Sequence, residues 1–144
     1  KTRLVIMRLG IVLESDGGAL RKMLPIFRAG FGGPIGSGLQ WMSWIHRTDL
    51  CELIKKAVEE QSWRGVFNAV APKPVSMATF ASTLGKTLSR PSLLPIPGPI
   101  LKALLGDGAR VVLEGQFVSS ERLEKMGFTF LYPELREAFN ASLN

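Results

Sequence analysis

Three residue types that carry much of enzyme chemistry are scarce in this sequence: its 144 residues include one cysteine, one histidine and one tyrosine. A lone Cys51 cannot form an internal disulfide bond, and no spacing of cysteine and histidine matches a metal site. The sequence therefore predicts no bound metal, and its cysteine usage fits a reducing compartment.

Long hydrophobic runs are also missing. Prolines and glycines interrupt every apolar stretch well before the roughly 18 residues that a membrane-spanning helix needs, so we expect no transmembrane segment. The chain begins with Lys1, and residues 2–9 read at once as a strand, with no signal or transit segment before them. On this pattern we expect a chain that opens in the middle of a longer protein.

The net charge is positive: the sequence has 18 basic and 12 acidic residues, which gives a formal net charge of +6. Clustered basic residues would favour nucleic-acid binding. The basic residues are scattered, however: Lys55 and Lys56, for example, lie among Glu52, Glu59 and Glu60. This mixture is typical of an ordinary solvated helix face, so we expect no nucleic-acid partner.

Two short apolar runs, at residues 3–9 and 66–71, have the composition of strands buried on both faces of a parallel sheet. Apolar residues spaced three and four apart predict helices that begin near residues 18, 49, 76, 99, 110, 119 and 133. Shorter strands are predicted over residues 40–46, 116–118 and 128–130. Two long buried strands are too few for a self-contained parallel sheet, so we expect their missing neighbours to come from another segment or chain.

Several phrases resemble the second half of extended short-chain dehydrogenases/reductases of the sugar-nucleotide epimerase type. They are Arg8-Leu9-Gly10-Ile11-Val12-Leu13 leading to Gly17-Gly18, then Trp44-Ile45-His46-Arg47-Thr48-Asp49, then Gly65-Val66-Phe67-Asn68. Three more, Gly32-Gly33-Pro34-Ile35-Gly36-Ser37-Gly38, Ala71-Pro72 and Leu113-Glu114-Gly115-Gln116, are similar to the narrower YfcH-like epimerase-family proteins of bacteria, plastids and animals. The resemblance extends over essentially all 144 residues.

The resemblance implies an α/β fold: the C-terminal part of a Rossmann-type extended short-chain dehydrogenase/reductase. Two parallel-sheet strands would be joined to a small, mostly helical subdomain on the substrate side. Residues 1–144 would form the C-terminal, substrate-side half, with residues 91–144 as a family-specific C-terminal segment. The N-terminal dinucleotide-binding half, which would hold most of an NADP cofactor, is absent from this chain.

The same resemblance implies that Gly10, Ile11 and Val12 lie near the nicotinamide carboxamide of the cofactor. The alternative is that Gly10 only relieves crowding at a strand end, and both interpretations remain open. The glycine-rich cofactor turn and the Tyr-x-x-x-Lys acid/base pair of the family belong to the other half. Tyr132 is followed four residues later by Arg136, so we expect it to pack, and no catalytic residue is expected in this chain.

Substrate contacts are predicted next to the glycine-rich loop at residues 30–38. The candidates are Ser37, Gln40, Trp41 and Trp44, which combine hydrogen-bonding groups with flat apolar surface. For each tryptophan the alternative is a place in the core.

Four further side chains carry structural expectations. We expect His46 to make a structural hydrogen bond, and Asp49 to cap a helix or hold the same corner. Arg8 is expected to pair with a carboxylate or carbonyl group at a buried strand end, and Cys51 to be buried.

Two functions follow from the resemblance. With its missing half, the protein would be an NADP-dependent oxidoreductase or a nucleotide-sugar-epimerase-like protein, and the present chain would not be catalytically competent alone. The alternative is a non-catalytic, NADP-sensing or scaffolding protein that acts through protein partners, in plastid or cell division. The expected partners are its own N-terminal half, an unidentified small-molecule substrate, and a protein bound at the proline-stiffened residues 91–105. The expected location is the plastid stroma in an alga or plant and the cytoplasm in a bacterium.

Overall fold

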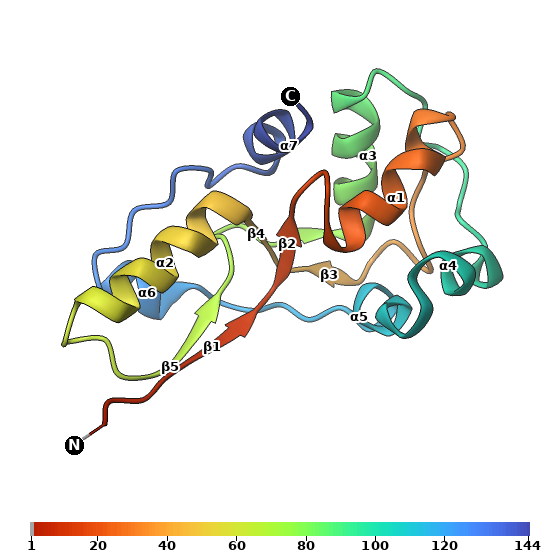
Figure 1. Ribbon diagram of the computed structural model, residues 1–144. Coiled ribbons are helices and arrows are strands. Elements are labelled where there is room, and N and C mark those ends of the chain that lie inside the picture. Colours follow the sequence, from red (N-terminus) through yellow and green to blue (C-terminus); the bar gives the residue numbers. More distant parts are fainter. Residues whose placement is uncertain (1) are drawn as a thin grey trace.

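Strands and helices alternate along the first half of the chain, and helices dominate the second half (Figure 1). The computed structural model describes residues 2–144. The strands are β1 (Val5–Leu9), β2 (Ile11–Leu13), β3 (Trp41–Met42), β4 (Trp44–His46), β5 (Gly65–Ala69) and β6 (Val75–Ser76). The helices are α1 (Gly18–Arg28), α2 (Arg47–Glu59), α3 (Met77–Thr87), α4 (Gly98–Leu105), α5 (Ala109–Glu114), α6 (Glu121–Lys125) and α7 (Leu135–Leu143), with a short 3-10 turn η1 (Gly106–Gly108). The predicted α/β class is confirmed.

Parallel pairing joins the first part of the chain to its middle. Strand β1 pairs in parallel with β5, from Val5 opposite Gly65 to Leu9 opposite Ala69. After Gly10 the chain continues into β2, which pairs in parallel with β4. A third, antiparallel pair joins β3 to β6. The prediction of two long strands in parallel arrangement is therefore confirmed.

Two hydrophobic cores hold these elements together. The larger core lies among α1, α3, α4 and α7, where Phe80 meets Phe139 edge to face with ring centroids 5.0 Å apart. The smaller core lies between α2, α6 and the β1–β5 pair, where Trp63 stacks on Phe67 at 4.8 Å. Aromatic pairs in these geometries add to the stabilisation that comes from burying their surface.

Helix α1 shows how local spacing produces the larger core. Its buried residues are Leu20, Met23, Leu24 and Phe27. This is the i, i+3, i+4, i+7 pattern of one helix face, which the sequence predicts. Pro25 lies inside the helix without ending it. The helix therefore presents an apolar stripe to the core despite its proline.

The residue that caps helix α2 differs from the predicted one. The helix begins at Arg47, two residues before the predicted start, and Nδ1 of His46 accepts a hydrogen bond from the Thr48 N–H at 3.1 Å. His46 therefore caps the helix, which confirms its expected structural role. Asp49 lies inside the first turn, so the capping prediction for Asp49 is wrong, although its alternative role at this corner holds.

Two short strands that the sequence predicts do not form. Residues 116–118 and 128–130 have no ladder partner in the part of the chain that the structure describes. The Val118 N–H donates to the side chain of Ser43 at 3.0 Å, and the Phe128 N–H donates back to the Leu123 carbonyl at the end of α6. These backbone groups thus find partners without joining a sheet.

Strand β1 is more exposed than its composition predicts. Ile6 and Leu9 are 45% and 59% exposed, so within residues 2–144 the strand is not buried on both faces. Arg8 is also exposed, and Cys51 lies on the outside of α2, so the predicted burial of both is wrong. The reason is that side chains alternate along β1, so Val5 and Met7 pack against the smaller core while Ile6 and Arg8 point to the opposite face, which is open to solvent.

Among residues 2–144, no helix has the length and apolar character to cross a membrane.

Candidate functional site

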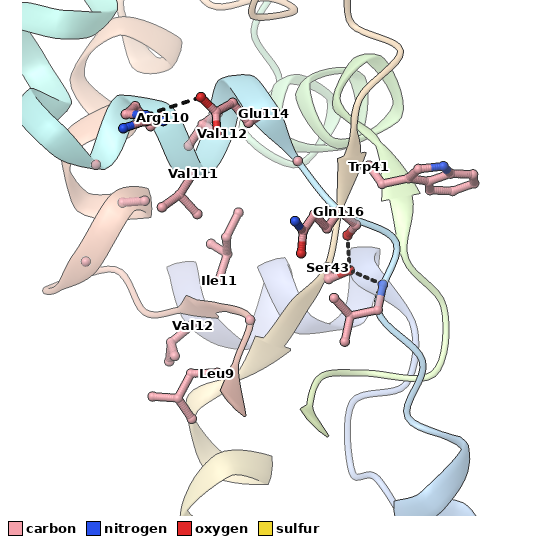
Figure 2. A pocket seen from close by; sticks show the side chains of 16 residues that line it. Leu9, Ile11, Val12, Trp41, Ser43, Arg110, Val111, Val112, Glu114 and Gln116 are labelled. Atoms are coloured by element: carbon pink, nitrogen blue, oxygen red, sulfur yellow. Dashed lines mark hydrogen bonds and ion pairs between the residues drawn. The ribbon is translucent and has the colours of Figure 1, made fainter. Parts of the chain in front are cut away.

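A cleft of about 580 Å³ opens where β1 ends (Figure 2). One wall consists of residues 9–12 together with Gly18 and Ala19 at the start of α1, and the opposite wall comes from residues 108–118. Trp41 and Ser43 complete the lining. In open α/β sheets, ligands bind in crevices outside the carboxyl ends of the strands, which is where this cleft lies.

The strand wall is tightly built around Gly10. Its N–H donates to the Ala69 carbonyl at 3.2 Å, and the Ile11 N–H donates to the Ser43 carbonyl at 2.9 Å. A Cβ atom at Gly10 would lie 2.7 Å from the Ser43 carbonyl oxygen and 2.8 Å from Cγ1 of Val70. Crowding therefore accounts for this glycine, and the same residue also lines the cleft. That Gly10, Ile11 and Val12 contact a cofactor stays a prediction.

The opposite wall is attached to residues 40–43 by side chains instead of a backbone ladder. The Ser43 hydroxyl donates to the Gln116 carbonyl at 2.7 Å and accepts from the Val118 N–H at 3.0 Å. Nε2 of Gln40 donates to the Val112 carbonyl at 3.1 Å. Gly115 follows α5, and a Cβ atom there would overlap the carbonyl oxygen of Trp41. Two polar side chains and one glycine thus position this wall.

The charged groups of the cleft pair with each other. Nε of Arg110 lies 3.2 Å from Oε1 of Glu114, one turn later on α5. The remaining side chains on both walls are mainly aliphatic, among them Leu9, Ile11 and Val111. The lining is therefore apolar, and its formal charges cancel.

The four predicted substrate residues are not brought together. Trp41 lines the cleft, but its ring points away from it and packs edge to face on Phe117, with centroids 5.1 Å apart (Figure 2). Trp44 is fully buried in the larger core, where Nε1 donates to the Lys73 carbonyl at 3.2 Å. Ser37 donates to Oε1 of Gln40 at 3.3 Å, and both lie outside this cleft. For Trp44 the alternative prediction, a place in the core, is therefore correct. Side chains alternate along the extended segment, so Trp44 lies on the same buried face as Met42.

Ser43 and Gln116 line the cleft although the sequence patterns did not single them out as site residues. The phrase Leu113-Glu114-Gly115-Gln116, which contributed to the family resemblance, was a signal for this wall. Ser43 carried no such signal, because its role depends on residues more than 70 positions away.

The glycine-rich loop at residues 30–38 packs against the protein. A Cβ atom at Gly32 would overlap the ring of Phe27, and one at Gly33 would overlap the backbone of Leu94. The loop follows α1, not a strand, so its glycines do not form a dinucleotide-binding turn.

A polar corner joins α2 to the C-terminal segment. Oδ1 of Asp49 accepts from the Leu131 N–H at 2.7 Å and Oδ2 from the Tyr132 N–H at 3.0 Å, while Asp49 is 1% exposed. The rings of His46 and Tyr132 lie 4.2 Å apart, so Tyr132 packs as predicted. Among residues 2–144 no cluster of three metal-ligating side chains occurs. This corner is therefore structural.

Burial at this corner lowers the pKa of His46 below its ordinary value of 6.5, and nearby Arg47 adds to that effect while Asp49 opposes it. Protonation consequently favours the unfolded chain. The stabilising effect of neutral His46 is complete above pH 6.5 and is lost as the pH falls from 6.5 through the lower pKa of the folded state. We expect His46→Asn, which retains a capping side chain, to reduce the fall in the urea midpoint of the full-length protein between pH 7.5 and 5.5. An unchanged fall would contradict this role.

Comparisons with known proteins show which proteins this chain is similar to. Residues 96–142 match the model of a domain of unknown function (DUF1731). The chain is 50% identical over 139 residues to the chloroplastic epimerase family protein SDR39U1 homolog of Arabidopsis thaliana, covering 96% of this chain and 40% of that protein. It therefore spans less than half the length of that relative.

Solved structures agree with this match. The crystal structure of human epimerase family protein SDR39U1 (isoform 2) with NADPH superposes with a TM-score of 0.91 at 41% identity, over 99% of this chain and 49% of that one. UDP-glucose 4-epimerase of Thermus thermophilus, solved with NAD, has a TM-score of 0.69 at 15% identity over 98% of this chain and 45% of that one, which shows a shared fold. The chain thus matches epimerase family proteins over nearly its whole length and fits the C-terminal half of an extended short-chain dehydrogenase/reductase.

Proposed function

We propose that this chain is the substrate-side half of an NADP-dependent oxidoreductase or nucleotide-sugar-epimerase-like protein. The observation that carries the proposal is the cleft at the end of β1, which is lined by Gly10, Ile11 and Val12. The similar human protein was solved with NADPH, which supports NADP as the cofactor. When bound, the cofactor would donate a hydride in its reduced form, NADPH, or accept one in its oxidised form, NADP⁺. The chain alone would not be catalytically competent, because most of the cofactor site would lie in the other half.

The backbone at Gly10 and Ile11 fits one part of such a cofactor. Both N–H groups are already bonded within the chain, to Ala69 and Ser43. Neither N–H group is free to donate to a ligand, so a backbone hydrogen bond from these two residues to a ligand would have to use a carbonyl oxygen, which can accept more than one hydrogen bond. A nicotinamide carboxamide carries an NH₂ group that can donate to such oxygens, so its chemistry matches this strand end.

The missing N-terminal half is proposed to dock against β1 and α2. A groove of about 550 Å³ runs between them and is lined mainly by apolar side chains, including Leu4, Ile54 and Val58, all of them exposed. The outer edge of β1 has no described partner, and unpaired strand edges attract further strands. The relatives are about twice as long as this chain, so they are long enough to supply a further strand and helices at this edge.

The proposed function is tested by NADPH binding to the full-length protein, followed through nicotinamide fluorescence. We expect the wild type to bind, and Gly10→Ala to weaken NADPH binding at least about tenfold. The added Cβ would be too close to both the Ser43 carbonyl oxygen and Cγ1 of Val70, so the strand wall of the cleft must shift.

Gly98→Ala is the matched control, because a Cβ atom there would meet nothing within 4 Å. It should bind NADPH like the wild type, and both variants should be checked for cooperative melting. Absence of binding by the wild type at millimolar NADPH would refute the proposal, and equal binding by both variants would remove Gly10 from the cofactor site.

Location and protein partners are further proposals. The chloroplastic relative supports the plastid stroma if this protein comes from an alga or plant. Leu93 and Leu94, in the proline-stiffened segment, are 85% and 58% exposed, and a protein partner at this segment stays a prediction. A non-catalytic role would be favoured if the upstream half kept its glycine-rich turn but had lost the Tyr-x-x-x-Lys pair.

A further inference from the structure

We propose that the cleft takes an uncharged, mostly apolar compound with one hydrogen-bonding oxygen, such as a ketone or a secondary alcohol, and not a sugar joined to a nucleoside diphosphate. The inference rests on the proposed function and names the substrate class of the same site. Three observations carry it: the charge balance of the lining, the aliphatic walls, and a single unengaged amide.

The first observation is the charge balance. Arg110 and Glu114 are the two charged residues of the lining, and they form an ion pair with each other. A diphosphate brings two negative charges, and taking these charges out of water is costly unless cations pair with them. With Glu114 beside it, Arg110 offers no net positive charge, so this wall lacks the counter-charges that a diphosphate requires.

Two further cationic side chains line a hollow beside the cleft. Arg21 and Lys22 line a neighbouring hollow that shares only Gly18, Ala19 and Gly108 with the cleft. Their side chains do not line the cleft, and the guanidinium group of Arg21 donates to the Asp16 carbonyl at 3.3 Å. The cleft lining itself therefore holds no cation besides Arg110 among the described residues.

The second observation is the match between the two walls. Ile11 on the strand wall and Val111 on α5 point toward one another across the cleft (Figure 2). Leu9, Val12 and Val118 also belong to the lining, although Val12 packs against the smaller core on the other side of the strand. Val111 is 63% exposed, so an apolar ligand between the walls would remove this surface from water. Burial of apolar area is favourable at roughly 25 cal/mol per Å².

The third observation concerns the uncharged polar side chains of the lining. The Ser43 hydroxyl uses both its donor and an acceptor position on Gln116 and Val118. The amide of Gln116 extends into the cleft beside Ile11 (Figure 2) and has no hydrogen-bond partner among residues 2–144. An amide both donates and accepts, so it can bind either a carbonyl or a hydroxyl group. Gln116 is thus the specificity-determining residue for the ligand oxygen.

The experiment uses the full-length protein saturated with NADP⁺, which cannot reduce a ketone, and two probes, 4-phenyl-2-butanone and UDP-glucose, each titrated by calorimetry. We expect saturable binding of the ketone and no binding of UDP-glucose at the same concentrations. Gln116→Leu should weaken ketone binding at least about fivefold without changing NADPH affinity, because it removes the polar anchor and keeps the apolar surface. Gln61→Leu, at an exposed position outside the cleft, is the matched control and should bind the ketone like the wild type.

A second variant tests the charge argument. Glu114→Gln leaves Arg110 unpaired, so UDP-glucose binding should appear or strengthen at least about fivefold, more so at low salt. Glu121→Gln, which breaks the corresponding i,i+4 pair with Lys125 on α6, should have no such effect.

Tighter binding of UDP-glucose than of the ketone by the wild type would overturn the inference. So would the absence of binding by either probe while NADPH still binds. NADPH binding is measured separately and first, so its failure identifies a failure of the proposed function, on which the inference rests.

Discussion

Replacing Asp49 with alanine is expected to lower the free energy of unfolding of the full-length protein by about 3 kcal/mol. Its carboxylate is buried and accepts two backbone hydrogen bonds, from Leu131 and Tyr132. Alanine removes both charge-assisted bonds and leaves two N–H groups without a partner. The C-terminal segment should then lose its attachment to the first turn of α2.

Two matched variants distinguish the loss of these hydrogen bonds from the effect of simply replacing an aspartate. Asp49→Asn keeps one acceptor oxygen and should cost about half as much, because its NH₂ group cannot accept from the second N–H. Asp107→Ala removes an exposed aspartate from η1 and should change stability by less than about 0.5 kcal/mol. Urea denaturation measures all three. If Asp49→Ala cost no more than Asp107→Ala, the corner would not hold the two segments together.

The second large effect is expected on the face where the other half is proposed to dock. In the full-length protein, Ile54→Asp should lower the free energy of unfolding by about 3 kcal/mol or more. Ile54 is 48% exposed in this chain and lines the groove with Leu4 and Val58. If the N-terminal half covers the groove, the new carboxylate is buried there, and the cation of the described lining, Arg3, is already engaged by the carbonyl groups of Ala57, Val58 and Trp63.

Leu93→Asp is the matched control for the docking face. Leu93 is 85% exposed and lies outside the groove, so the substitution should change stability by less than about 0.5 kcal/mol. Thermal or urea denaturation of the two full-length variants gives the comparison. Equal, small effects of both substitutions would show that the groove is open to solvent in the whole protein.

Local elements of this protein follow from its sequence because their causes lie within a few residues. The apolar spacing of α1 predicts its buried stripe, and Ser76 caps α3 by accepting from the Thr79 N–H at 3.2 Å. The two parallel strands and the cleft wall at Gly10 are likewise marked by short phrases of sequence. Helical periodicity and side-chain capping act over one or two turns, so they can be read directly from residue order.

The substrate wall of the cleft required the tertiary structure. Ser43 meets Gln116 and Val118, and Asp49 meets Leu131, across more than 70 residues in each case. No local period records such contacts. The exposure of Arg8 and Cys51 was equally beyond the sequence pattern, since burial depends on which segments cover a strand or a helix face.

Residue order is enough to predict the α/β class, the family resemblance, the main helices and the strand end that borders the cleft, because periodicity, caps and family phrases are local. It does not predict that Trp44 packs in the core, that the ring of Trp41 points away from the cleft, or that Gln116 faces it. The physical reason is that a side chain's partner is set by the packing of distant segments, and neighbouring residues along the chain do not specify that packing.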